Sequence, residues 1–193
     1  GDVTGDKSRV VGYSSVLIYA LEGAEKKGEL IMKDEYLNKE EKKKLLEIAR
    51  LSVIEAVTGK RQFYPNVAEE KLKENCGAFV TLNERGQLRG CIGYIQAVKP
   101  LYETVKDVAK SAAVNDYRFN PVTQDELDKL ELEISVLTPL KRIKDISEIE
   151  VGRHGLYMKK GFNSGLLLPQ VAAEYNWDKE TFLKETCRKA GLA

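Results

Sequence analysis

Residues 88–93 read Leu-Arg-Gly-Cys-Ile-Gly and place a thiol between two glycines, with a cation directly before the first glycine, inside an otherwise apolar strand. A glycine inside a strand weakens it and usually marks a bulge or a place where a ligand or another backbone comes close. Upstream, residues 76–82 have the composition of a first strand, and residues 83–86 supply turn residues that end in a glycine. The pattern predicts a β-hairpin with Cys91 on its second arm.

The segments around this hairpin predict long helices and further strands. Apolar side chains recur at helical spacing over residues 38–57, and Pro100 begins a second helix whose alanines allow close approach to a sheet. Residues 130–137 alternate as in a strand buried on one face, and residues 154–159 and 165–168 form a further strand pair. Because regular βαβ alternation is missing, we expect an α+β fold with an antiparallel sheet flanked by helices.

These stretches, with others along the chain, resemble the signature of the AMMECR family. The resemblance runs from about Leu37 to Leu192 and rests on residues 77–82, 88–93, 116–119, 132–139, 154–156, 165–170 and 186–192. It implies a larger and a smaller lobe with a cleft between them. The biochemical function of the family is not established, so any chemistry has to be argued from the residues.

Residues 1–36 precede the AMMECR-like domain, which we place at residues 37–193. Residues 10–21 are apolar, β-branched and aromatic, as in a strand. Residues 1–15 also resemble the C-terminal end of Memo-like proteins, which occur fused in front of AMMECR domains in some prokaryotes. We interpret the segment as a remnant of such a fusion, and the alternative is an ordinary N-terminal strand added to the sheet edge.

Composition disfavours several classes of function. The chain has 31 Lys and Arg against 30 Asp and Glu, so no overall field attracts nucleic acid or an anionic membrane, and we expect neither partner. No apolar run approaches the ~20 residues of a membrane span. Cys76, Cys91 and Cys187 share no C-x-x-C spacing and come with a single histidine, which favours a cytoplasmic location and no metal. The glycines form no phosphate-binding loop, so we expect no cofactor.

Cys91 is the one nucleophilic side chain in the glycine hairpin, and His154 is the sole histidine. A thiolate forms at neutral pH when a base or cation lies nearby, and a spatially adjacent histidine supplies that. We therefore predict that Cys91 and His154 face one cleft as tentative catalytic residues. The alternative is that Cys91 is a small hydrophobe and His154 a hydrogen-bonded core residue.

The binding candidates lie beside Cys91. Arg89, Gly90 and Gly93 belong to the same strand, and in an ideal strand the side chain of Arg89 shares a face with the thiol. Asp116 and Arg118 belong to a polar turn expected at the rim of the cleft. The guanidinium of Arg89 is expected to bind a carboxylate or phosphate, or to form a structural salt bridge to Asp116 or Glu133. The Asp116 and Arg118 pair can equally stabilise its own turn.

Two functions from different classes follow. One is a partner or scaffold module that binds a protein, such as the Memo-like or radical-SAM proteins with which these domains are associated, in a protein-modification system. The other is an enzyme that uses Cys91 as nucleophile and His154 as base on a small or peptide-derived substrate. The sequence does not decide whether the protein is an enzyme, nor its oligomeric state.

Overall fold

The computed structural model describes residues 9–13, 16–19, 36–138 and 140–192 of the chain, which divides into two compact units. Unit 1 comprises residues 1–12 and 37–136, and unit 2 comprises residues 13–36 and 137–193. The predicted α+β class is confirmed, since both units combine a sheet with helices. The domain boundary placed after residue 36 stays a prediction.

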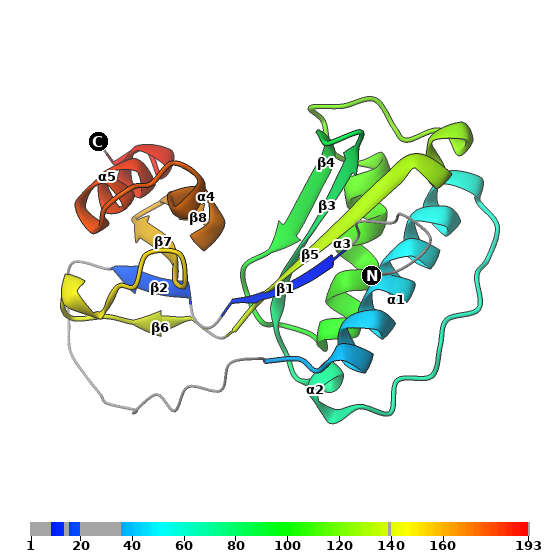
Figure 1. Cartoon of the computed structure of the whole chain (residues 1–193), viewed down its shortest axis with the longest axis horizontal. Coiled ribbons are helices and arrows are strands. Elements are labelled where there is room, and N and C mark those ends of the chain that lie inside the picture. The colour runs from blue at the N-terminus through cyan, green and yellow to red at the C-terminus, as the bar shows by residue number, and fades with distance from the viewer. Residues whose placement is uncertain (1–8, 14–15, 20–35, 139, 193) are drawn as a thin grey trace. The chain divides into compact units, whose positions relative to one another are not determined.

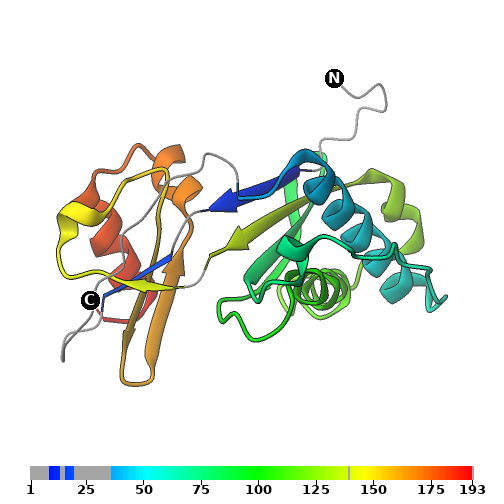
Figure 2. The same ribbon diagram turned by 90° about the horizontal axis from the view of Figure 1, so that it is seen from below.

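Unit 1 is a four-stranded sheet with helices packed on one face. The strand order is β1 (Arg9–Tyr13), β5 (Leu130–Leu137), β3 (Gly77–Glu84) and β4 (Gln87–Tyr94), so β4 lies at an edge. Helices α1 (Lys39–Thr58) and α3 (Leu101–Val114) lie side by side, and α3 contacts β3 and β4 (Figures 1 and 2). The short α2 (Glu70–Lys73) and the 3₁₀ helix η1 (Gln124–Lys129) connect these elements.

Local sequence explains where α1 begins and ends. The Asn38 side chain accepts a hydrogen bond from the Glu41 backbone N–H, and the Glu41 carboxylate accepts one from the Asn38 N–H, which is a capping box. Gly59 ends the helix in the left-handed conformation at φ 69°, where a side chain is disfavoured. Between these caps, Leu45, Ile48 and Val53 are buried against the rest of unit 1, so packing and capping agree.

Unit 2 is a second four-stranded sheet in the order β6 (Lys141–Arg142), β2 (Val16–Tyr19), β7 (Gly155–Lys160) and β8 (Asn163–Leu167). The unit also contains η2 (Ile146–Glu148), α4 (Pro169–Glu174) and α5 (Lys179–Lys189), and α5 contacts β7 and β8. Strands β7 and β8 form the predicted antiparallel pair, whereas β2 runs parallel to both β6 and β7. The sheet of unit 2 is therefore mixed, and its core is built around Phe182 and Leu156.

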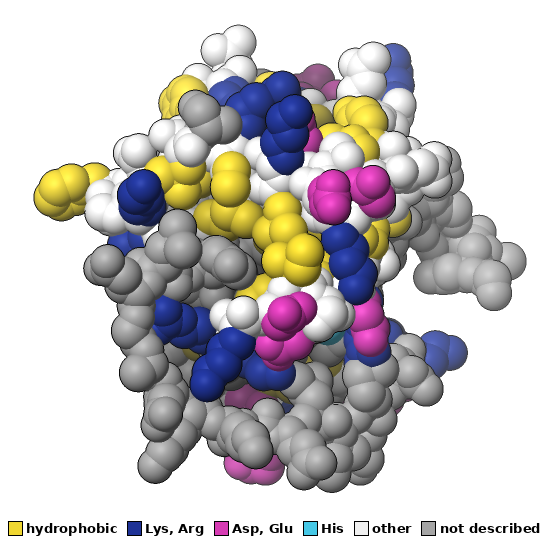
Figure 3. Space-filling view, turned by 90° about the vertical axis from the view of Figure 1, so that its left-hand side faces the viewer, with side chains coloured by type: hydrophobic (Ala, Val, Ile, Leu, Met, Phe, Trp, Pro, Cys, Tyr) yellow, Lys and Arg dark blue, Asp and Glu magenta, His cyan; other side chains and the backbone are white. Residues whose placement is uncertain are grey.

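The described residues on the face drawn in Figure 3 form no large patch of one charge sign. On the face drawn in Figure 3, Lys and Arg side chains are interspersed with Asp and Glu, and hydrophobic side chains reach the surface between them. This mixture agrees with the formal net charge of +1. Among the described residues, no helix is both long and apolar enough to cross a bilayer.

Candidate functional site

Gly90 sits in the predicted hairpin at a point of close backbone approach. A Cβ added to Gly90 would lie 2.3 Å from the carbonyl oxygen of Ala112, so β4 touches the backbone of α3 there. Gly93 lies opposite Phe79 in the β3–β4 register, and its Cβ would fall 2.3 Å from the Phe79 ring. The space that both glycines leave open is thus occupied by the chain itself.

The outer edge of β4 is covered at Cys91 by two charged side chains. The Cys91 N–H donates to Asp116 Oδ2 at 2.8 Å, and Arg118 Nη2 donates to the Cys91 carbonyl at 3.1 Å. Arg118 also donates to both oxygens of Asp116, at 2.9 and 2.7 Å. We call this arrangement of Cys91, Asp116 and Arg118 the Cys91 clamp. It satisfies the backbone groups that an edge strand otherwise leaves unpaired.

Electrostatics favours the ionised form of the clamp. The side chain of Asp116 is only 2% exposed, and the adjacent Arg118 guanidinium, with the Cys91 N–H, holds its carboxyl pKa well below the usual range. A buried carboxylate needs such a partner, because desolvation alone would raise its pKa. These contacts agree with the prediction that Asp116 and Arg118 stabilise their own turn. The pair also binds the backbone of β4 at Cys91.

The side chain of Arg89 does not follow the alternation of an ideal strand, which predicted that it shares a face with the Cys91 thiol. Leu82 pairs with Gly90 and Asn83 with Leu88, so Arg89 is the extra residue of a β-bulge and the strict alternation with Cys91 is interrupted. Its guanidinium pairs with Glu126 at 2.6 Å and donates to the Asn120 and Pro121 carbonyls. The salt-bridge partners considered from sequence, Asp116 and Glu133, are therefore wrong for Arg89. The Arg89 guanidinium lowers the pKa of Glu126 to about 2.

The thiol of Cys91 projects from the sheet face opposite α3. Thr81 is its cross-strand neighbour, and the Thr81 hydroxyl lies 3.1 Å from Cys91 Sγ, within donating distance. Neighbouring Gly90 faces α3, so by alternation Thr81 and Cys91 face away from it. Cys91 is half-buried, unlike the fully buried Cys76.

His154 belongs to unit 2, in the turn before β7. Its backbone N–H donates to the Glu150 carbonyl at 2.9 Å, and its ring Nδ1 accepts from the Glu150 N–H at 3.1 Å. The residue is 8% exposed, and this burial lowers the pKa of its imidazole. The structure thus joins Cys91 to Asp116 and Arg118, whereas His154 is described within another unit and its pairing with Cys91 stays a prediction.

The turn that carries the clamp also presents an aromatic side chain. Tyr117 lies between Asp116 and Arg118 and is 94% exposed. The loop is closed by the Phe119 N–H, which donates to the Asp116 carbonyl at 3.0 Å, and the Arg118 guanidinium lies 5.5 Å from the centre of the Phe119 ring. Tyr117 is therefore held outward by a loop whose other side chains are engaged.

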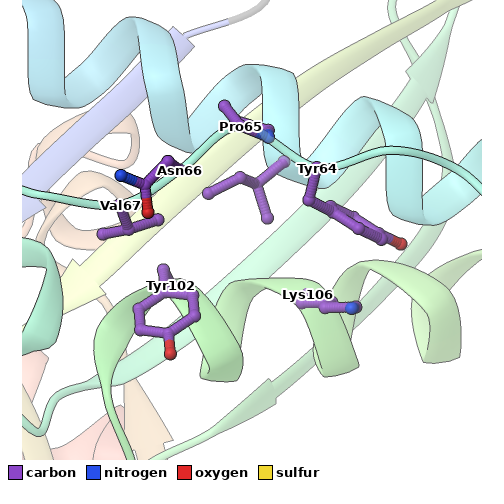
Figure 4. Close-up of a pocket in the computed structure, with 7 residues that line it drawn as sticks. Tyr64, Pro65, Asn66, Val67, Tyr102 and Lys106 are labelled. Carbon is purple, nitrogen blue, oxygen red and sulfur yellow. The ribbon is translucent and has the colours of Figure 1, made fainter.

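Unit 1 has a pocket on its helical side that the sequence did not indicate. A cavity of about 430 Å³ lies between α1, α3 and the segment before α2. We call it the Lys106 pocket, and its lining residues are Ile48, Tyr64, Pro65, Asn66, Val67, Tyr102 and Lys106 (Figure 4). The segment 64–67 has neither helical nor strand periodicity, and the aromatic and proline content that marks it is also common in ordinary loops. No sequence signal therefore distinguished it.

Side chains that could ligate a metal ion were compared over the part of the chain that the structure describes. Within it, no group of three or more His, Cys, Asp or Glu side chains is arranged to hold a metal ion.

The sequence and the fold of this chain are similar to those of known proteins. A family model described as AMMECR1 matches residues 46–193. A protein of Methanothermobacter thermautotrophicus is 44% identical over 168 residues, covering 83% of this chain and 88% of that protein. A protein of Thermococcus kodakarensis is 46% identical over 159 residues, covering 77% and 78% of the two chains. The crystal structure of an uncharacterized protein from Pyrococcus horikoshii is 45% identical, with a TM-score of 0.69, covering 77% of this chain and 78% of that one.

Proposed function

This chain belongs to the AMMECR1 family, whose members are conserved and have no known function, and from that premise we propose that it is a protein-binding module. It acts as a partner or scaffold subunit of a protein-modification system. We assign it Memo-like or radical-SAM partners because such domains are associated with both classes. The resemblance of residues 1–15 to the end of Memo-like proteins supports the first class only, and residues 1–8 and 14–15 of that segment lie outside the part of the chain that the structure describes.

The observation that carries this proposal is the presentation of Tyr117. Its neighbours Asp116 and Arg118 are bound to the backbone of Cys91, so the loop is fixed before any partner arrives. A fixed loop lowers the entropy lost on binding, and tyrosine is among the residues that contribute most at interfaces. A 94% exposed tyrosine on such a loop has the properties of an interface anchor.

The polar groups of the motif also support a module over an enzyme. Asp116 and Arg89 are engaged in contacts within unit 1. The Nδ1 atom of His154 already accepts a hydrogen bond from Glu150, and neutral imidazole carries its proton on the other nitrogen. Accepting a proton from a thiol would require that arrangement to break.

A binding experiment with a matched control tests the proposal. We expect the full chain to bind a purified Memo-like or radical-SAM protein in calorimetry, and Tyr117→Ser to weaken that binding by at least ~10-fold, since interface anchors contribute roughly 2 kcal/mol or more. Phe162→Ser, at an exposed aromatic of unit 2, should leave binding unchanged. Absence of binding to both classes of partner, or equal binding by Tyr117→Ser and the parent, would overturn the proposal.

One observation favours the alternative, an enzyme with Cys91 as nucleophile and His154 as base. The thiol is half-buried and lies within hydrogen-bond distance of the Thr81 hydroxyl, which can orient the sulfur towards a substrate. Iodoacetamide labelling followed by mass spectrometry separates the two functions, because Cys187 is also half-buried and serves as the reference. Labelling of Cys91 at least ~10-fold faster than Cys187 favours the enzyme, and similar rates favour the module.

A further inference from the structure

The Lys106 pocket combines a hydrophobic floor and wall with one cation. Ile48 of α1 forms part of the lining and is 2% exposed, and Pro65 and Val67 add apolar surface. Tyr64, Pro65, Asn66 and Val67 come from the segment that crosses α1, and Tyr102 and Lys106 come from α3, as Figure 4 shows. A volume of about 430 Å³ lies within the range of small-molecule sites.

Lys106 differs from the neighbouring lysines in what it contacts. Lys110 pairs with Glu55 at 2.7 Å, Lys44 pairs with Glu69, and Lys99 pairs with Asp107. In the described ranges of the chain, no carboxylate pairs with Lys106, and its Nζ lies 3.8 Å from the centre of the Tyr64 ring. An ammonium held on an aromatic ring keeps N–H donors available for an anion.

The Tyr64 ring is itself fixed from behind. Its hydroxyl donates to Glu55 Oε2 at 3.0 Å, and the same oxygen accepts the Gln62 N–H at 3.2 Å. The other oxygen of Glu55 accepts from Lys110, and these bonds lower the Glu55 pKa to about 2. Glu55 therefore stays ionised at neutral pH, with Lys110 as its partner, and the ring under Lys106 needs no rearrangement to accept a ligand.

From these observations we propose that the Lys106 pocket binds a small organic carboxylate with an apolar body. The carboxylate pairs with Lys106 Nζ, and the apolar body packs on Ile48, Pro65 and Val67. Asn66 and Tyr102 border the same cavity with polar groups. The site is separate from the Cys91 clamp and from Tyr117, so it adds a small-molecule function to the proposed protein-binding one.

The probe is 3-phenylpropionate, with the uncharged 3-phenylpropionamide as its matched control. In amide NMR of the full chain, we expect saturable shifts at Asn66, Val67, Tyr102 and Lys106 with a dissociation constant of roughly 1 mM. The amide should bind about tenfold more weakly, because a charge-assisted hydrogen bond is lost. Absence of saturable shifts up to about 10 mM, or equal binding of acid and amide, would overturn the proposal.

Two variants locate the site. Lys106→Met keeps the stem and removes the charge, and should weaken 3-phenylpropionate about tenfold, while Lys43→Met on the exposed side of α1 should not. Val67→Phe fills the cavity and should abolish the shifts by a different route, which keeps the test valid if Lys106→Met is poorly folded. Unchanged binding by Val67→Phe, or by a folded Lys106→Met, would overturn the assignment.

Discussion

The hairpin around Cys91 and the pocket around Lys106 lie in the same unit but use their polar groups in opposite ways. In the Cys91 clamp, the carboxylate and guanidinium bind each other and the strand backbone. In the Lys106 pocket, the ammonium lies on an aromatic ring beside a cavity. The hairpin motif that stands out in the sequence therefore uses its polar groups to stabilise the fold. The loop at residues 64–67, which has no distinctive sequence pattern, lines the pocket.

The largest expected effect in this comparison comes from Gly90→Val. The added Cβ would clash with the Ala112 carbonyl at 2.3 Å, and because that atom belongs to the backbone, strand and helix must move apart. We expect a loss of more than ~4 kcal/mol in unfolding free energy, measured by urea denaturation. Gln87→Val, at an exposed position of β4, is the control. Equal stability of Gly90→Val and the parent would contradict the close approach.

Removing the carboxylate of the clamp should have the next largest effect. Asp116→Ala leaves the Cys91 N–H and the Arg118 guanidinium without their buried partner, at a cost of about 2 to 4 kcal/mol in unfolding free energy. Arg118 is 44% exposed on its side chain, so water takes over part of its solvation and the lower half of that range applies. Asp128→Asn, at an exposed site, should change the unfolding free energy little. An Asp116→Ala variant as stable as the parent would show that the clamp contributes nothing.

Acid should destabilise the hairpin around Cys91 through two carboxylates, that of Asp116 in the clamp and that of Glu126, which pairs with Arg89. Asp116 and Glu126 both have a pKa lowered in the folded protein, chiefly by Arg118 and Arg89. Their stabilisation is therefore complete above the unfolded pKa values of about 4, and is lost as pH falls towards the folded values. We expect the unfolding free energy to decrease between roughly pH 4.5 and pH 2. The double variant Asp116→Asn and Glu126→Gln should flatten this slope, and an unchanged slope would contradict the assignment.

The smallest effects on stability belong to the two proposed binding groups. Tyr117→Ser and Lys106→Met remove an exposed ring and a cation without a carboxylate partner among the described residues, so each should change the unfolding free energy by no more than about 0.5 kcal/mol. Thermal or urea unfolding of the full chain measures this. A loss of more than about 2 kcal/mol in unfolding free energy would show that the residue stabilises the fold, and would contradict its proposed role as a binding group.

Much of unit 1 could be predicted because its signals are local. The apolar spacing over residues 38–57 predicted α1, the alternation over residues 130–137 predicted β5, and the turn glycine with its flanking strands predicted the β3–β4 hairpin. Each rests on residues close in sequence, where periodicity and caps act directly.

Other features depend on partners distant in sequence and could not be predicted. The bulge at Arg89 cancels the alternation that had suggested a shared face with Cys91, and its salt-bridge partner Glu126 lies 37 residues further along the chain. The parallel pairing of β2 with β7 joins segments far apart along the chain. The stacking of Lys106 on Tyr64 likewise exists only after α3 and the loop before α2 have packed.

Amide hydrogen exchange at Cys91 tests most directly the claim that Asp116 and Arg118 of the Cys91 clamp stabilise the edge strand β4. Cys91 and Gly93 lie two residues apart on the edge strand, and Asp116 caps the first of them. We predict that the Cys91 N–H exchanges at least ~10-fold more slowly than that of Gly93, and that Asp116→Ala removes the difference. Equal exchange of the two amides in the parent chain, or an unchanged Cys91 rate in Asp116→Ala, would contradict it.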